Sequence, residues 1–312
     1  MKIRITMLLM IGILLGQLQG AELHPDHYYI ELIKHYMSLG EYDLALQVAE
    51  TNPDVDSPDS LAWLQGQIYK FRQENKKAVD YFIETIIITE NQDLQNLAYD
   101  DLERLLRAMD PIEVIEILTN LLETVKGDLY LRIILKLAEI YESKSLYEEA
   151  NDIYISLLNG ENFRDTLGLR IKVATNSMFR KNYDQAIRFA RQSQNESDSL
   201  FIPQALFIEF MGYYSQNKLD KALIPLLKLY LEYPVFSRKF EIYLSLVELF
   251  LYKGEDLAAL YLLEEYYPLA GLLEKRIIDE KVQTILDNLQ EKPGRHQLFK
   301  LFKPDFGKLL HR

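Results

Sequence analysis

AEIYESKSLYEEANDIY, residues 138–154, is followed 36 residues later by ATNSMFRKNYDQAIRFA, residues 174–190. Both segments place alanine at their first and thirteenth positions and tyrosine at their tenth. Small residues at such spacing let two helices approach closely. The pattern therefore predicts a helical hairpin that is repeated along the chain.

The alanine in the second helix of each hairpin serves as a marker for the repeat. The markers are Ala45, Ala78, Ala150, Ala186, Ala222 and Ala259. The gap of 72 residues after Ala78 leaves room for one degenerate unit centred on Val114, and the spacings then become 33, 36, 36, 36, 36 and 37. A regular period of this length is the sequence signature of a helical solenoid.

Each predicted helix has one apolar face, as Leu32, Tyr36 and Leu39 show in the first hairpin. A single hairpin cannot cover these stripes, whereas stacked hairpins bury them against one another. The chain has only 13 Gly and 10 Pro in 312 residues and is 48% hydrophobic, which favours an all-α fold with a large core.

These residues resemble the tetratricopeptide repeat (TPR) family over residues 24–268. The resemblance implies an α-solenoid of about seven hairpins, wound as a right-handed superhelix. The period is longer than the family's 34 residues, and the unit around Leu102 to Leu118 lacks the small-residue pair. We expect residues 21–291 to form the repeat domain, with a capping helix from about 269 to 290 and a break at Pro293-Gly294.

The resemblance also implies that the first helices of the hairpins line a groove that binds a segment of a protein partner. The side chains at the family's groove positions are mostly apolar or aromatic, a composition typical of interface cores. They are Trp63, Gln67, Phe71, Ile171, Met178, Phe179, Phe207, Met211, Tyr214, Leu251 and Tyr252. The alternative is that several of these residues face a neighbouring helix instead.

The N-terminus has the layout of a secretory signal peptide over residues 1–20. Lys2 and Arg4 precede an apolar run from Ile5 to Leu15, and small residues follow near Gly20. The run is shorter than the roughly 17 to 25 residues needed to span a bilayer, so cleavage is favoured over anchoring. We therefore expect a periplasmic or secreted protein. The chain contains no cysteine, so an exported form relies on its core rather than on disulfides.

The charge of the chain is unevenly distributed. The net charge is −12, yet residues 292–312 hold six basic side chains against Asp305. Because phosphate binding needs clustered cations, the acidic body argues against a nucleic-acid partner. The basic tail alternates Lys with Leu and with Phe299, Phe302 and Phe306. It is a candidate contact for a partner, for an acidic membrane surface or for the chain's own groove, and a frayed terminus is the simpler alternative.

Catalytic motifs are absent from the sequence: there is no nucleophile elbow, phosphate-binding loop, zinc-protease motif or dinucleotide fingerprint. His24, Asp26 and His27 form a weak metal-ligand pattern that more often is incidental. We predict a non-enzymatic scaffold or adaptor of the cell envelope, with no cofactor and no metal. The alternative is an enzyme, or an accessory subunit of one, that acts on envelope glycans through facing carboxylates.

Overall fold

A computed structural model describes residues 25–51, 57–160, 166–195 and 200–291, and these ranges contain helices and turns but no strand. The first eight helices are α2 (Pro25–Ser38), α3 (Tyr42–Thr51), α4 (Pro58–Phe71), α5 (Asn75–Ile88), α6 (Gln92–Leu106), α7 (Pro111–Leu122), α8 (Gly127–Ser143) and α9 (Tyr147–Asn159). They are followed by α10 (Thr166–Phe179), α11 (Tyr183–Gln194), α12 (Ile202–Ser215), α13 (Leu219–Glu232), α14 (Lys239–Tyr252), α15 (Asp256–Tyr266), a short 3-10 turn η1 (Tyr267–Leu269) and α16 (Leu272–Glu291).

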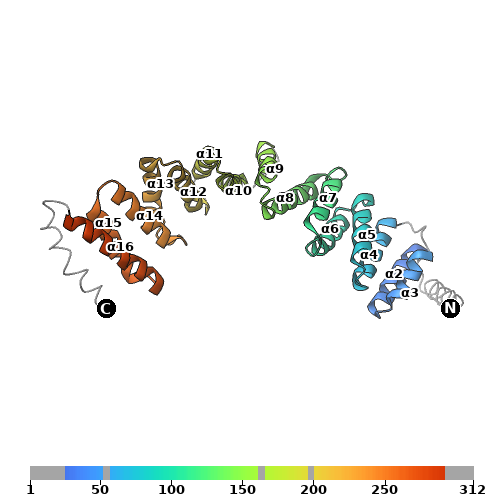
Figure 1. Cartoon of the computed structure of the whole chain (residues 1–312). Helices are drawn as coiled ribbons and strands as arrows, with labels where there is room; N and C mark the ends of the chain where they lie inside the picture. The colour runs from blue at the N-terminus through green and yellow to red at the C-terminus, as the bar shows by residue number, and fades with distance from the viewer. Residues whose placement is uncertain (1–24, 52–56, 161–165, 196–199, 292–312) are drawn as a thin grey trace. The chain divides into compact units, whose positions relative to one another are not determined.

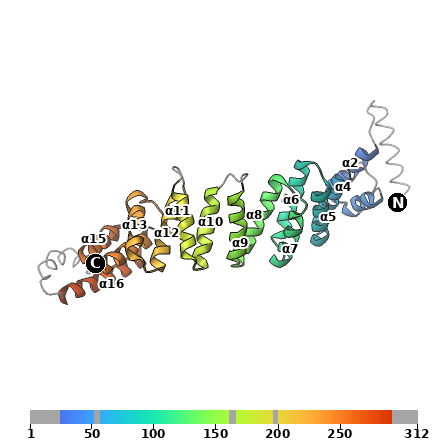
Figure 2. The same ribbon diagram turned by 90° about the horizontal axis from the view of Figure 1, so that it is seen from above.

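The described helices follow one another as seven successive pairs, α2–α3 to α14–α15, and then α16 (Figure 1). The chain divides into two compact units, with the boundary between Ile140 and Tyr141 inside α8. We call residues up to 140 unit 1 and the remainder unit 2. Within each unit consecutive helices pack side by side, as with α4 on α5 and α11 on α12 (Figure 2). The predicted all-α solenoid of about seven hairpins is confirmed.

The marker alanines lie at the tightest helix contacts. All six, from Ala45 to Ala259, have no solvent exposure. Close approach also needs small residues in the first helices: a Cβ added at Gly66 would lie 2.6 Å from a ring carbon of Phe82, and one at Gly212 would lie 2.6 Å from Ile187 Cγ1. Larger side chains at these positions would force the paired helices apart.

The turn inside most hairpins has one residue with a left-handed backbone. These residues are Gly40, Gln73, Ser145, Lys181, Asn217 and Gly254, with φ between 57° and 79°. Each one precedes a marker alanine by five positions. The left-handed residue ends the first helix and lets the chain reverse, and glycine fits it best because it has no Cβ. Four of the six positions nevertheless hold a residue other than glycine.

The hairpin α6–α7 is built differently, in agreement with the degenerate unit predicted around Val114. Val114 is buried on α7, where the other hairpins have alanine. The turn before α7 has no left-handed residue; Asp110 instead caps the helix, its side chain accepting a hydrogen bond from the amide of Ile112, and Pro111 begins the helix. In this hairpin the N-cap side chain and the proline define the start of α7, in place of the left-handed residue found in the other turns.

The last described helix, α16, covers the end of unit 2. Its buried side chains Ile278, Val282, Ile285 and Leu289 join the core formed by α12 to α15. None of the described helices has the length and apolar content needed to cross a membrane. The predicted signal peptide, residues 1–20, and the basic tail, residues 292–312, lie outside the described residues.

Candidate binding surface

The predicted groove residues of unit 1 lie on α4, in a setting dominated by charge. Gln67 is buried, and its side-chain amide donates a hydrogen bond to Asp101 of α6. Phe71 is 53% exposed and stacks on Tyr42 with ring centroids 5.4 Å apart. Trp63 is half-buried, and its indole Nε1 is buried without a hydrogen-bond partner among the described residues.

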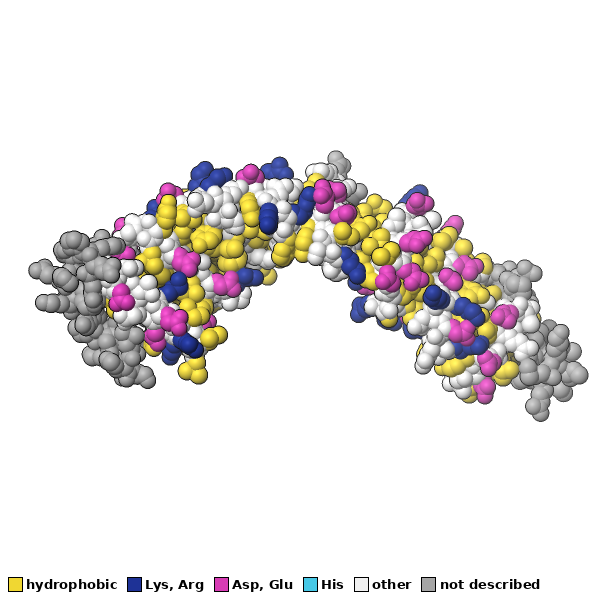
Figure 3. All heavy atoms as spheres, in the orientation of Figure 1, with side chains coloured by type: hydrophobic (Ala, Val, Ile, Leu, Met, Phe, Trp, Pro, Cys, Tyr) yellow, Lys and Arg dark blue, Asp and Glu magenta, His cyan; other side chains and the backbone are white. Residues whose placement is uncertain are grey.

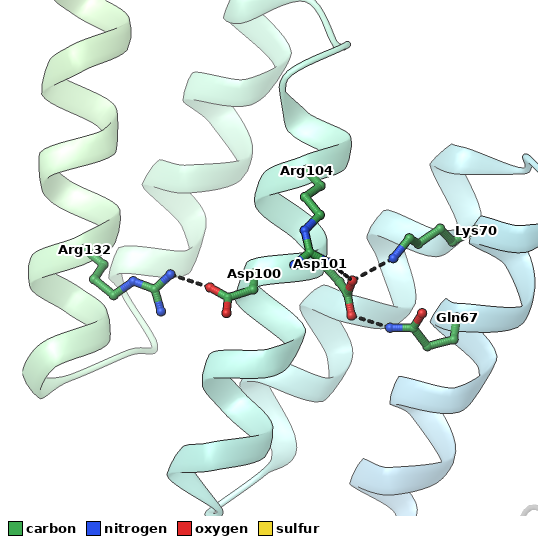
Figure 4. A network of polar contacts seen from close by, with 6 residues as sticks. All are labelled: Gln67, Lys70, Asp100, Asp101, Arg104 and Arg132. Carbon is green, nitrogen blue, oxygen red and sulfur yellow. Dashed lines mark hydrogen bonds and ion pairs between the residues drawn. The ribbon is translucent and has the colours of Figure 1, made fainter. Parts of the chain in front are cut away.

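Asp101 is the centre of a polar network that joins α4 and α6 (Figure 4). Its side chain is 9% exposed and accepts from Lys70 Nζ at 2.7 Å and from Arg104 at 3.1 Å, in addition to Gln67. A buried carboxylate is stable only when such partners surround it. The network therefore holds α4 against α6 through the buried Asp101 carboxylate.

A second set of ion pairs joins α6 to α8. Asp100 pairs with Arg132 at 2.6 Å, and Glu103 pairs with Lys136 at 3.0 Å (Figure 4 shows the first pair). The guanidinium of Arg132 also lies 4.8 Å from the centre of the Tyr99 ring. Three successive first helices of unit 1 are thus connected by charged side chains. We call this set of contacts the ionic row.

In unit 2 four of the predicted residues line one apolar hollow. Met178 and Phe179 come from the last turn of α10, and Phe207 and Met211 come from α12. Phe236 and Arg238, in the segment before α14, complete its wall. The hollow has a volume of about 570 Å³, which is typical of pockets that bind small ligands.

The rings of the hollow support one another. Phe207 lies 6.2 Å from Phe236, and Arg238 places its guanidinium 4.8 Å from the Phe207 ring while pairing with Glu241 at 3.1 Å. Phe179 is 61% exposed, although one face of its ring stacks on Tyr147 at 4.9 Å. Figure 3 shows apolar side chains on the surface of both units, interspersed with charged ones. An exposed and preformed aromatic surface of this kind is suited to a partner's apolar side chain.

The remaining predicted residues of unit 2 do not line the hollow. Ile171 is buried in α10 with 4% exposure, which favours the alternative that its side chain packs inside the unit. Gln67 in unit 1 is also buried, and its hydrogen bond to Asp101 of α6 favours the same alternative. Tyr214 lies next along α12, and its hydroxyl donates to Glu248 at 3.3 Å. Burial, followed by the nearby Glu248 carboxylate, raises the pKa of the Tyr214 hydroxyl. Leu251 and Tyr252 lie at the end of α14, and Tyr252 is 68% exposed.

Two polar clusters of unit 2 were not predicted. Glu209 is buried on α12 and accepts from Arg191 Nε and Gln194 Nε2 of α11, each at 2.7 Å. The hydrogen bond to Glu209 raises the pKa of Arg191. Glu265 accepts from Tyr230 at 2.6 Å and from Tyr243 at 3.0 Å. Polar residues at helical spacing are indistinguishable in sequence from a solvated face, so no signal separated these clusters.

No metal-binding group of three His, Cys, Asp or Glu side chains occurs in the part of the chain that the structure describes. Asp101, Glu209 and Asp256 are each only 6% exposed, and the first two have basic or amide partners that hold them in place. These contacts give Asp101 and Glu209 a structural role, in which they connect neighbouring helices.

Comparison with known proteins supports the fold and nothing finer. No family model matches the chain, and no curated protein matches it. A solved structure of Naa15/Naa10 bound to HypK-THB matches 93% of the chain with a TM-score of 0.60 at 11% identity. A signal transduction ATPase from Pyrococcus horikoshii with a TPR sensor matches 84% of it at 18% identity and a TM-score of 0.47.

A TPR protein from Parabacteroides merdae covers 84% of the chain and 98% of its own length at 14% identity, with a TM-score of 0.36. The chain spans 43% of the matched Naa15/Naa10 chain and 44% of the ATPase, less than half of each. The resemblance to tetratricopeptide repeats is confirmed for the fold.

Proposed function

We propose that this chain is a protein-interaction scaffold whose unit 2 binds an apolar segment of a partner in the hollow of α10 and α12. The observation that supports the proposal most is the meeting of Met178, Phe179, Phe207 and Met211 in one exposed hollow. These side chains lie on two different helices; Phe179 is largely exposed, and the other three are partly buried, with Phe207 and Met211 also packed against the core of unit 2. Their clustering has a simple reason if a partner covers them.

The chemistry of the hollow indicates the kind of segment. Methionine adapts its shape to different apolar side chains, and rigid aromatic rings supply contact area at low entropic cost. Arg238 at the rim already pairs with Glu241 at 3.1 Å, and we expect its remaining guanidinium donors to bind a carboxylate of the partner. We therefore expect a short segment with a bulky apolar anchor and an adjacent acidic residue.

The cellular setting of the proposal comes from the sequence. The signal-peptide pattern of residues 1–20 implies export, so the expected partners are proteins of the cell envelope or secreted proteins. Signal-peptide cleavage in producing cells, read by N-terminal sequencing of the exported chain, tests this setting. Recovery of the chain with residues 1–20 attached, in the cytoplasm alone, would contradict it.

A matched set of variants tests the binding site. Phe179→Ser and Met211→Gln change the hollow, whereas Tyr261→Ser changes a side chain of α15 that is 60% exposed and outside the hollow. The purified variants are used to capture proteins from envelope extracts, and the captured proteins are quantified by mass spectrometry. We expect the two hollow variants to lose at least one protein that the wild type and Tyr261→Ser both retain. Identical capture by all four chains would contradict the proposal.

A further inference from the structure

The hollow of unit 2 has a candidate occupant within the same chain. Residues 297–306 read QLFKLFKPDF, in which two Leu-Phe pairs and Phe306 alternate with Lys300 and Lys303. Phe302 and Phe306 are anchors of the size that the hollow accommodates, and Asp305 stands directly before Phe306. The segment therefore has the apolar anchor and the adjacent carboxylate that the aromatic wall and Arg238 favour.

The polar contacts between α12, α14 and α16 show how far this segment has to reach. Glu248 of α14 accepts from Tyr214 of α12 at 3.3 Å and pairs with Lys281 of α16 at 3.1 Å. Residue 281 is thus two helix spacings, on the order of 20 Å, from α12. The last residue of α16, Glu291, lies about 15 Å further along the helix axis, given a rise of 1.5 Å per residue.

Phe207, in the hollow, lies two helical turns before Tyr214 on α12. Together with the spacing between the helices and the length of α16 beyond residue 281, this gives roughly 30 Å between residue 291 and the hollow. An extended chain spans about 3.3 Å per residue, so Phe302 reaches about 36 Å and Phe306 about 50 Å from residue 291. Both anchors are within reach, and neither requires α16 to move.

The charges favour the same arrangement. Residues 141–291 hold 23 acidic and 17 basic side chains, a net of −6, whereas residues 292–312 hold six basic side chains and one acidic, a net of +5. Glu248 and Glu142, on the first helices α14 and α8 that flank the hollow, are each already paired with a lysine, Lys281 and Lys172 respectively, so the attraction comes from the net charge of the body and not from these two carboxylates. Attraction between a basic segment and an acidic body raises the effective concentration of the segment at the hollow.

We infer that residues 297–306 occupy the hollow through Phe302 or Phe306 when no partner is bound, so that a partner must displace the chain's own tail. This inference rests on the proposed function, since it takes the same hollow as the binding site. The tail is then an internal competitor for the hollow. The binding free energy of a partner is reduced by the free energy of the tail contact that the partner must break.

A peptide-binding experiment on the full chain tests the inference. The tail variant carries Phe299→Ser, Phe302→Ser and Phe306→Ser in the otherwise unchanged chain, which vacates the hollow. The probe is a fluorescent synthetic peptide of residues 295–310, and its binding is measured by anisotropy. We expect the tail variant to bind the peptide at least 10-fold more tightly than the wild-type chain, whose hollow is already occupied.

Two further variants, made in the tail-variant chain, locate the binding. Phe179→Ser should weaken peptide binding at least 10-fold, and Tyr261→Ser should leave it unchanged. Both side chains are about 60% exposed, so neither change threatens folding. Absence of peptide binding to the tail variant, or equal weakening by both substitutions, would overturn the inference.

Other occupants of the hollow appear as distinct results. A wild-type chain that sediments as a dimer, and a Phe179→Ser chain that sediments as a monomer, would replace the tail with a second copy. Binding of the wild-type chain to phosphatidylglycerol vesicles that is lost in the tail variant, without peptide binding, would assign the tail to a lipid surface. Either result overturns the inference. If the peptide fails to bind but hollow variants still lose a captured partner, the proposed function stands alone. If the peptide binds and capture is unaffected, the tail contact stands, but the proposed function fails and with it the displacement of the tail by a partner.

Discussion

The two units use the same hairpin but differ in what their first helices present. Lys70 on α4 and Met178 on α10 both stand eight residues before their marker alanines, Ala78 and Ala186. Lys70 is held by the buried Asp101, whereas Met178 lines an apolar hollow. The repeat sets the path of the backbone. The side chain at this position decides whether the surface is covered by contacts within the chain or stays exposed to a partner.

The overall charge of each unit follows the same division. Residues 21–140 hold 23 acidic and 10 basic side chains, a net of −13, against −6 for residues 141–291. Repulsion among so many carboxylates in unit 1 is relieved where cations are inserted between helices, as Lys70, Arg132 and Lys136 are. The ionic row is therefore a device for stability, and the hollow of unit 2 is the surface we assign to binding.

The largest effect is expected at the centre of the ionic row. Asp101→Ala leaves Lys70 and Gln67 without their shared partner, and we expect a loss of about 3 kcal/mol in the free energy of unfolding. Asp100→Ala is the matched control, since Asp100 is its sequence neighbour but is 45% exposed and should cost about 0.5 kcal/mol. Urea unfolding measures both. Equal losses in the two variants would show that burial of Asp101 has no special weight.

The second prediction compares helix contacts in the two units. Gly66→Ala places a methyl group against the fully buried ring of Phe82 in unit 1, and we expect a cost of about 2 kcal/mol. Gly212→Ala places a methyl group against Cγ1 of Ile187 in unit 2, an aliphatic side chain smaller than the Phe82 ring, and should cost about 1 kcal/mol. Adding Phe82→Leu to Gly66→Ala should recover part of the loss in thermal unfolding. A double variant less stable than the sum of the two changes would refute the steric explanation.

The hairpin turns offer a change in the opposite direction. Lys181 has φ of 59°, and Lys181→Gly should stabilise unit 2 by about 0.5–1 kcal/mol because glycine adopts this conformation without steric cost. Gly254→Ala, at the equivalent position with φ of 79°, should destabilise by about 1 kcal/mol. Changes of opposite sign in the free energy of unfolding, measured by chemical denaturation of the two variants, would support the turn as described. A destabilised Lys181→Gly chain would contradict it.

The smallest effect concerns alkaline pH and unit 2. Burial, together with the hydrogen bond to Glu265, raises the pKa of Tyr230 to about 12 and also raises the pKa of Tyr243. The folded chain holds these protons more strongly than the unfolded chain, so their contribution is complete below pH 10 and is lost as the pH rises towards 12. We expect Tyr230→Phe to reduce this loss by ~0.5 kcal/mol after solvent screening. Melting temperatures of the wild-type and Tyr230→Phe chains from pH 8 to 11.5 measure this difference. The same pH profile in both chains would count against the Tyr230–Glu265 contact.

Much of the fold follows from residues whose spacing reports their burial. The alanine markers predicted six of the seven described hairpins, and the gap after Ala78 located the seventh, in which Val114 takes the place of alanine. The turns were harder to predict from the sequence, because the left-handed positions at Gln73, Ser145 and Lys181 do not hold glycine, the residue that usually indicates this conformation. Their conformation is imposed by the packing of the two helices that they join.

The binding surface was only partly predictable from sequence. The first-helix positions of α10 and α12 gave four residues of the hollow, but Phe236 and Arg238 come from the segment before α14, which has no fixed place in the repeat. The sequence did not separate Gln67 and Ile171, which are buried, from the exposed residues of the predicted set. Whether a position is exposed depends on the rotation of the individual helix, which the repeat pattern does not specify.

Photo-crosslinking along both first-helix rows is the most direct test of the central claim that unit 2, and not the ionic row, receives the partner. A photoreactive phenylalanine is placed at Phe71 or Lys70 in unit 1 and at Phe179 or Met211 in unit 2, and the chain is irradiated in the cells that produce it. The account predicts adducts with another protein from Phe179 and Met211 and none from Phe71 or Lys70. Adducts from the unit 1 positions alone would contradict it.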